Sequence, residues 1–224
     1  MKVSVVIPVY NEERALPLVL QELKQQGQEL DIVVADNGST DKTFVAAQAA
    51  NVKVAFEPRR GYGQACQAGL RAVAKESEVV VFLDGDHSDY PEDLPKLLEP
   101  IERGEAELVI GSRTLDQAQR ASLTPQQRMG NWLASRLISW RFGRRCTDVG
   151  PFRAIKHDAL QRLNLRERAF GWNIEMHVKA LKAGLRIVEV PVRARPRLGH
   201  PKSTGPLETV GACAAILRVI AKNW

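Results

Sequence analysis

VVVFLDGDHSDYPEDL, residues 79–94, joins five apolar residues directly to a run of acidic ones. Residues 79–83 have the length and the β-branched content of a buried strand, and Asp84, Gly85 and Asp86 follow at once. Bringing two carboxylates together at the end of a buried strand costs free energy unless a positive charge offsets it. The stretch therefore predicts a cation site at the end of a strand.

Strands and helices alternate through the first half of the chain. The further apolar runs are residues 3–9, 31–35, 52–56 and 107–112, and the helical patterns lie near 13–26, 41–50, 63–75 and 92–103. This alternation predicts an α/β fold with a mostly parallel central sheet covered by helices. Ligands bind beyond the carboxyl ends of such strands. Because YNEE, DNGSTD and DGD all follow strands, the sequence predicts the site at that edge.

The second half is less regular. Its expected helices are residues 127–145, 173–182 and 207–222, and its expected strands are 152–155 and 186–192. Residues 193–205 have the Pro, Gly and Ser content of a loop. Without an internal repeat or a flexible linker, the 224 residues are expected to form one domain, which we divide into a first half (1–112) and a second half (113–224).

Charge is divided unevenly between these halves. Residues 1–112 carry 11 basic and 19 acidic residues, whereas 113–224 carry 21 and 7. The division predicts a cation site first and an anionic ligand or surface second, although two differently composed solvated faces would give the same counts. The three cysteines are widely spaced, and we recognise neither a secretory leader nor an 18-residue apolar segment. These observations favour a cytoplasmic protein.

Three motifs carry chemistry. Asp84 and Asp86, separated by one glycine, offer the hard oxygen ligands that Mg²⁺ or Mn²⁺ prefers, although D-x-D alone is common. Asp36 ends the second strand, where it could accept hydrogen bonds from a base or ribose while the residues after it cap a helix. Gly61 and Gly63 precede a helix and could let a phosphate or sugar approach its N-terminus.

In their order and spacing, these motifs resemble family 2 glycosyltransferases, in particular the branch of dolichyl-phosphate mannose and glucose synthases. The stretches that carry the resemblance are VVIPVYNEE, ADNGSTDKT, RRGYGQACQAG, FLDGDHSDYPEDL, VIGSR, DVGPFRAI and the RxRxxG-x-x-KS segment over 195–203. The resemblance covers roughly residues 3 to 205, and it implies that 1–112 form the nucleotide-sugar and metal half of the domain and 113–224 the acceptor-binding half. It implies a GT-A fold, a UDP- or GDP-linked sugar donor, a divalent cation (Mg²⁺ or Mn²⁺), inversion at the anomeric carbon and a polyprenyl-phosphate or similar lipid acceptor.

The resemblance also implies roles for single residues. Those expected to bind the nucleotide sugar are Pro8, Tyr10, Glu12, Asp36, Gly61, Gly63 and Asp84. Asp86 is the expected metal ligand. The cations expected around the donor diphosphate or the acceptor phosphate are Arg113, Arg153, Arg197 and Lys202. His87 and Ser88 stand where the family typically has Leu-Gln, which leaves further metal ligands open, and His87 is expected to lie behind the ligands or at the surface.

The acceptor class decides whether a base is needed. A lipid phosphate is already an anion, and the basic helix over 127–145, with Met129, Trp132 and Trp140, would suit peripheral contact with a membrane, although packing explains that helix equally well. A hydroxyl acceptor would need a carboxylate base, with Glu175 as first candidate and Asp148 as second. Glu175 could instead be structural and pair with Lys179.

Two other functions fit parts of the sequence. Thirty-two basic residues suggest nucleic-acid binding, but the acidic first half and the lack of a recognition motif argue against it. A sugar nucleotidyltransferase would also use carboxylates and Mg²⁺, but it should carry a Gly-rich basic loop where this chain has YNEE. We therefore expect a hexosyltransferase that binds no nucleic acid, and a homodimer is compatible with the sequence.

Overall fold

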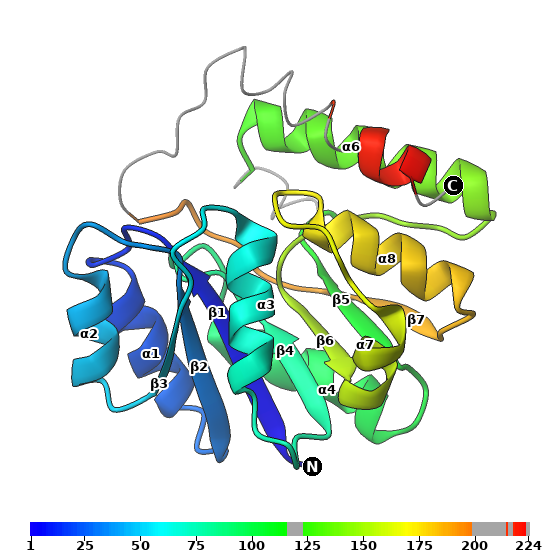
Figure 1. Cartoon of the computed structure of the whole chain (residues 1–224). Helices are drawn as coiled ribbons and strands as arrows, with labels where there is room; N and C mark the ends of the chain where they lie inside the picture. Colours follow the sequence, from blue (N-terminus) through cyan, green and yellow to red (C-terminus); the bar gives the residue numbers. More distant parts are fainter. Residues whose placement is uncertain (116–122, 199–213, 215–216, 223–224) are drawn as a thin grey trace.

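One seven-stranded sheet forms the centre of the molecule in the computed structural model, which describes residues 1–115, 123–198, 214 and 217–222 (Figure 1). The strands are β1 (Val3–Val9), β2 (Leu30–Asp36), β3 (Lys53–Phe56), β4 (Val79–Phe82), β5 (Leu108–Ser112), β6 (Arg153–Lys156) and β7 (Ile187–Pro191). Their order is β3-β2-β1-β4-β6-β5-β7, and only the pairs made by β6 are antiparallel. The predicted, mostly parallel sheet is confirmed, and strands from both halves of the chain share it.

Helices cover both faces of this sheet (Figure 1). They are α1 (Leu16–Lys24), α2 (Thr43–Ala49), α3 (Tyr62–Ala72), α4 (Leu94–Glu102), α6 (Pro125–Phe142), α7 (His157–Leu163) and α8 (Trp172–Lys182), with a short 3₁₀ turn η1 (Pro91–Asp93). Val79 and Val81 of β4 pack with α1 and α4, whereas Val80 and Phe82 pack with α3, α7 and α8. Because both faces are buried, the strand is apolar throughout rather than alternating.

The helix expected over 127–145 corresponds to α6, but its buried face differs from the apolar side in the sequence. Trp132 and Trp140 are 62% and 72% exposed, whereas Ala134 and Ile138 are fully buried. The buried Ala134 and Ile138 belong to a cluster with residues of α8, whereas Trp132 and Trp140 face outward. Packing therefore does not account for these two tryptophans.

The end of the described chain packs on the same side of the molecule. Val219 and Ile220 are buried in a cluster with residues of α6 and α8. The helix expected over 207–222 is described at 214 and 217–222, where the residues are helical. No helix among the residues described is long and apolar enough to cross a membrane.

Candidate functional site

Acidic side chains gather at the carboxyl ends of β1, β2 and β4, the edge that the sequence predicts. β1 and β2 end side by side because Val9 pairs with Asp36, and β4 flanks the other side of β1. The acidic residues at these strand ends are Glu12, Asp36, Asp84, Asp86 and Asp89. Asp84 and Asp86 are half-buried and the other three are buried, so these two are the most accessible to a ligand.

Asp36 has one carboxylate oxygen without a partner. The residue is fully buried, and its Oδ1 accepts hydrogen bonds from the backbone N–H of Ser39, at 3.3 Å, and from the Ser39 hydroxyl. Its Oδ2 is buried and has no hydrogen-bond partner among the residues that the structure describes. A buried acceptor left unpaired costs about 1–3 kcal/mol. The oxygen is therefore suited to accept a hydrogen bond from a ligand.

The turn after β4 brings three carboxylates together. Asp84 Oδ1 accepts a hydrogen bond from Tyr62 Oη at 3.0 Å, and the Asp84 N–H donates to Asp89 Oδ2 at 3.3 Å. Burial, together with the charges of Asp84 and Asp86, raises the pKa of Asp89 to about 8, although Arg113 opposes the shift. Positive charge at this turn would relieve the repulsion, as the sequence predicts.

Glycine is required between the two aspartates for a packing reason. A Cβ at Gly85 would lie 2.4 Å from Cγ1 of Val9 in β1. The turn can therefore lie directly against the end of β1, which places Asp84 and Asp86 at the edge of the sheet.

Arg113 is fixed beside this acidic cluster by Asp148. Its Nε and Nη2 donate to the two carboxylate oxygens of Asp148 at 2.9 and 2.8 Å, and its backbone N–H donates to Asp148 Oδ2 at 2.9 Å. Burial alone would lower the pKa of Arg113, but the charges of Asp148, Asp89 and Asp84 raise it. Because both carboxylate oxygens of Asp148 accept hydrogen bonds from Arg113, this residue orients Arg113, and the arrangement disfavours a role for Asp148 as a base.

Arg197 lies between two acidic residues of the site. It belongs to residues 192–198, a segment that follows β7 and that we call the strap. Its Nη2 donates to Glu12 Oε1 at 2.6 Å, and its Nη1 lies 3.7 Å from Asp86 Oδ2. Its Nε is buried and has no hydrogen-bond partner in the described part of the chain. The Leu198 N–H donates to the Asp86 carbonyl at 2.9 Å, which ties the strap to the turn after β4.

Tyr10 and Asn37 organise the other side of the site. The Cζ atom of Arg60 lies 3.0 Å from the centroid of the Tyr10 ring. Asn37 Nδ2 donates to the carbonyls of Glu57 and Arg59 at 3.0 and 2.7 Å and so fixes the loop that carries Arg60. Sequence reasoning missed Asn37 and Arg60, although Asn37 directly follows Asp36 at the end of β2. Pro8, which precedes this region in β1, is buried.

The two glycines before α3 contact the protein closely. A Cβ at Gly61 or Gly63 would lie 2.2 Å from the carbonyl oxygen of Arg168 or Glu167, respectively. These carbonyls belong to residues 164–169, which we call the capping loop. The Gly63 N–H donates to the Ala169 carbonyl at 3.3 Å, so this amide is not free to meet a phosphate as the sequence suggested. Contact of both glycines with a nucleotide sugar stays a prediction.

The remaining expected cations differ in accessibility. Arg153 is fully buried, its guanidinium donates to the carbonyls of Gly150 and Asn173, and burial lowers its pKa to about 10. A role for Arg153 in phosphate binding stays a prediction, since these contacts are internal. Lys202 lies outside the described residues. His87 Nε2 pairs with Glu22 Oε1 at 2.8 Å, consistent with a place behind the acidic cluster.

Glu175 is buried in the first turn of α8. Its Oε2 accepts hydrogen bonds from the N–H groups of Arg166 and Glu167 at 2.9 and 2.7 Å. Its Oε1 pairs with Lys179 Nζ at 2.8 Å. Both oxygens have partners in the protein, which favours the structural alternative over a base.

The turn after β4 could bind a divalent cation if phosphate oxygens and water provided most of the ligands. Among the residues that the structure describes, no three His, Cys, Asp or Glu side chains are grouped to hold a metal ion by themselves. Mg²⁺ commonly binds through one or two carboxylates and completes its shell with phosphate oxygens and water. Asp84 and Asp86 provide that number of accessible carboxylates, so the donor set fits a metal that arrives with a phosphate ligand.

A cavity lined by two arginines, which we call the basic cavity, lies along α6. It has a volume of about 450 Å³ and is lined by Arg128, Trp132 and Arg136 of α6, among other residues. Thr114 and Thr147 also line it, and these two residues adjoin the Arg113–Asp148 pair in the chain. The cavity thus combines two guanidinium groups with hydroxyl groups of residues that neighbour Arg113 and Asp148 in the chain.

Comparisons with known proteins identify the family. The sequence profile of glycosyl transferase family 2 matches residues 4–163. An uncharacterized glycosyltransferase of Mycobacterium tuberculosis is 36% identical over 223 residues, which cover 96% of this chain and 94% of that protein. An undecaprenyl-phosphate mannosyltransferase of Micrococcus luteus is 34% identical over 217 residues, which cover 92% of this chain and 88% of that protein.

A solved structure supports the fold. Glucosyl-3-phosphoglycerate synthase from Mycobacterium tuberculosis, crystallised with Mn²⁺, UDP and phosphoglyceric acid, matches with a TM-score of 0.79 and 22% identity, and the match covers 99% of this chain and 78% of that one. The predicted GT-A fold is therefore confirmed. From the profile match and the two sequence relatives, we conclude that the chain belongs to glycosyl transferase family 2.

Proposed function

We propose that the protein transfers a hexose from a nucleoside diphosphate sugar to a polyprenyl phosphate, with a divalent cation at Asp86. The observation that carries the proposal is that the unpaired, buried oxygen of Asp36 and the Asp84–Asp86 carboxylates occupy one edge of the sheet. This arrangement suits a nucleoside at the end of β2 with its diphosphate at the end of β4. The undecaprenyl-phosphate mannosyltransferase relative supports the acceptor class.

The donor would be held chiefly by residues on β1, β2 and the turn after β4. Asp36 Oδ2 would accept a hydrogen bond from the base, and Tyr10 would provide an aromatic face beside it. Asp84, oriented by Tyr62, would bind the ribose or the sugar. Asp86 would hold Mg²⁺ or Mn²⁺, which when bound would neutralise charge on the leaving diphosphate, and the structural relative contains Mn²⁺ with UDP.

The reaction requires no proton transfer from the acceptor. A phosphate oxygen of the acceptor, already deprotonated near neutral pH, would attack the anomeric carbon opposite the leaving group. The bond from that carbon to the donor diphosphate would break, the electron pair would leave with the nucleoside diphosphate, and the configuration would invert. This agrees with Glu175 and Asp148, whose carboxylate oxygens all have partners.

The acceptor phosphate would bind in the basic cavity. Arg128 and Arg136 line it and would pair with the phosphate, and Arg113 would face the donor side. The outer face of α6, which we define by Met129, Trp132 and Trp140, is exposed and next to these arginines. Tryptophan and arginine suit the membrane interface, so this face would contact the cytoplasmic side of a membrane peripherally.

The test is transfer from UDP-glucose and GDP-mannose to undecaprenyl phosphate in the presence of Mn²⁺. Undecaprenol, which lacks only the phosphate, is the matched control acceptor. We expect release of a nucleoside diphosphate with undecaprenyl phosphate and none with undecaprenol. Equal transfer to undecaprenol would assign a hydroxyl acceptor, and release of pyrophosphate would assign nucleotidyl transfer.

A further inference from the structure

The capping loop, residues 164–169, completes the start of α3 (Figure 1). The N–H of Gln64 donates to the Arg168 carbonyl at 3.0 Å, and that of Gly63 donates to the Ala169 carbonyl at 3.3 Å. The first N–H groups of a helix have no partner within the helix, so the loop supplies acceptors that the helix itself lacks. The position of the loop and the position of the α3 start are therefore linked.

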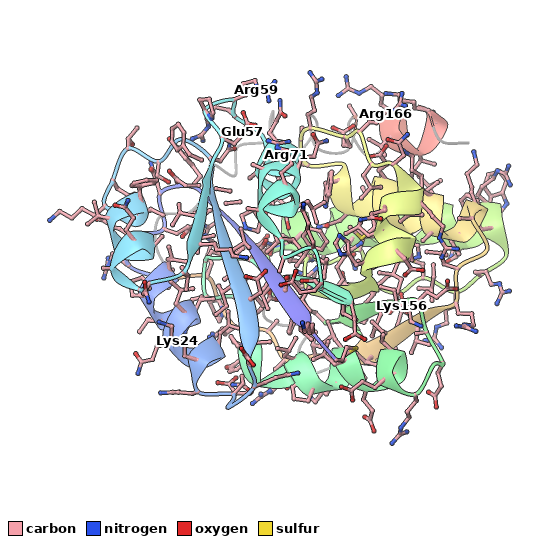
Figure 2. The ribbon with its side chains drawn as sticks, turned by 60° about the horizontal axis from the view of Figure 1, so that its bottom comes forward. Lys24, Glu57, Arg59, Arg71, Lys156 and Arg166 are labelled. Carbon is pink, nitrogen blue, oxygen red and sulfur yellow. The ribbon has the colours of Figure 1, made fainter. Side chains whose placement is uncertain are left out.

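Two residues of α8 hold the capping loop from behind. Glu175 Oε2 accepts from the N–H groups of Arg166 and Glu167 at 2.9 and 2.7 Å, and Figure 2 labels Arg166 on this loop. Lys179 Nζ lies 2.8 Å from Glu175 Oε1 and donates to the Asn164 carbonyl at 2.7 Å. One carboxylate and one ammonium group thus bind backbone atoms at the beginning and the middle of the loop. Hydrogen bonds to charged groups are the stronger ones in proteins.

The contact between the loop and α3 leaves little room for movement. A Cβ at Gly63 would lie 2.2 Å from the Glu167 carbonyl oxygen, so the two backbones are as close as glycine permits. Tyr62 is the first residue of α3, and its Oη donates to Asp84 Oδ1 at 3.0 Å. A displacement of the loop would therefore shift Tyr62 and disturb its hydrogen bond to the Asp84 carboxylate.

We propose that Glu175 and Lys179 are positioning residues of the donor site, which act through the capping loop to hold Tyr62 against Asp84. The inference rests on the proposed function in that it treats Asp84 as a donor ligand. In this role Glu175 affects how tightly the nucleotide binds, whereas a catalytic base would affect how fast the acceptor reacts.

The experiment compares Glu175→Gln and Lys179→Met with Glu99→Gln. The control breaks another pair at i,i+4 spacing, between Glu99 and Arg103, on the exposed side of α4. Amide hydrogen exchange in the 61–67 segment should be at least about tenfold faster in both α8 variants and unchanged in the control. In titrations with UDP and GDP in the presence of Mn²⁺, the Kd of the nucleotide that binds wild type should rise about fivefold in both.

A third variant disturbs the same contact from the opposite side. Gly63→Ala leaves Glu175 and Lys179 intact but pushes the loop away, so it should reproduce the faster exchange and the weaker nucleotide binding. It also decides the question if Glu175→Gln does not fold. Unchanged exchange in folded Lys179→Met and Gly63→Ala would overturn the inference.

Activity separates the two roles of Glu175. Unchanged exchange and unchanged nucleotide affinity in Glu175→Gln, combined with a lower kcat and the loss of one limb of its pH profile, would make Glu175 a base and overturn the inference. If wild type binds neither UDP nor GDP, the proposed function fails, while the exchange of the 61–67 segment still decides whether Glu175 and Lys179 position α3.

Discussion

Replacing Arg197 by glutamine should change metal binding and nucleotide binding in opposite directions. In the free protein, the Arg197 guanidinium lies 2.6 Å from Glu12 Oε1 and 3.7 Å from Asp86 Oδ2. It thus holds a positive charge beside the carboxylate to which we assign the metal. A metal ion that binds alone must compete with this charge, whereas a metal that arrives with a diphosphate gives Arg197 a new partner.

The contacts of Arg197 set the size of the effect. Coulomb attraction between unit charges 3.7 Å apart is about 4 kcal/mol at an effective dielectric constant of 20. The Arg197 side chain is 25% exposed, and solvent screening reduces the net value of such a pair to about 1 kcal/mol. Arg197→Gln should therefore bind Mn²⁺ alone about fivefold more tightly. It should bind UDP or GDP with Mn²⁺ about tenfold more weakly, since a charged donor to phosphate contributes about 1.5–3 kcal/mol.

The assay is titration of free Mn²⁺ by electron paramagnetic resonance, followed by calorimetry with UDP and GDP at saturating Mn²⁺. Arg193→Gln is the matched control, because Arg193 also lies on the strap but pairs with Asp93, 2.9 Å away, rather than with Asp86. The control should bind Mn²⁺ as wild type does. If Arg197→Gln binds Mn²⁺ no more tightly than Arg193→Gln, Arg197 does not compete with the metal and the reasoning fails.

Three further predictions address the metal, the membrane and pH. Asp86→Asn should leave the fold intact and weaken Mn²⁺-dependent UDP or GDP binding at least about tenfold by calorimetry; unchanged affinity would remove Asp86 from the metal site. Wild type should float with anionic liposomes at low salt and less so at high salt, and the double variant Trp132→Gln/Trp140→Gln should float less, whereas replacing the equally exposed Phe170 should change nothing. Absence of wild-type flotation at low salt would count against membrane contact. The hydrogen bond from Arg59 and the charge of the nearby Arg71 lower the pKa of Glu57 to about 2 (Figure 2), so the ionised Glu57 should stabilise the protein by about 1 kcal/mol above pH 4.5 and should lose this effect as the pH falls towards 2. The free energies of unfolding in urea of Glu57→Gln and wild type should therefore converge in acid, and a difference that stays constant with pH would contradict the assignment.

The strands β1, β4 and β5 could be predicted from the sequence because each is a short, largely apolar run that is buried along its whole length, whereas β3 and β7 at the edges of the sheet are only partly buried. The helix α7 (His157–Leu163) could not be predicted, because it begins at the residue directly after β6 and has only seven residues. The buried face of α6 was also misleading: Ala134 and Ile138 are buried there while the larger Trp132 is exposed. Periodicity reports where apolar residues recur, but the fit between neighbouring helices selects which of them are buried.

The candidate site divides in the same way. Asp36, Asp84 and Asp86 could be placed because strand ends in a parallel sheet share an edge. Glu175 bonds a loop that lies only 8 to 9 residues before it, but the contact of that loop with Gly63 joins Gly63 to Ala169, far apart in the sequence, and periodicity does not report it. Glycines before a helix suggested an open phosphate site, and only the packing of the loop shows that the Gly63 amide is occupied.

The uneven distribution of charge has two physical explanations that act in different places. In the strap, Arg193, Arg195 and Arg197 pair with Asp93, Glu22 and Glu12 of the first half, so part of the basic excess is neutralised within the molecule. On α6, Arg128 and Arg136 line an open cavity beside exposed tryptophans, where an outside anion can reach them. Some of the basic residues thus fix the strap beside the donor site, and others, on α6, remain accessible to an acceptor phosphate. Salt should consequently weaken binding to an anionic surface through α6 far more than it affects the half-buried pairs of Arg195 and Arg197.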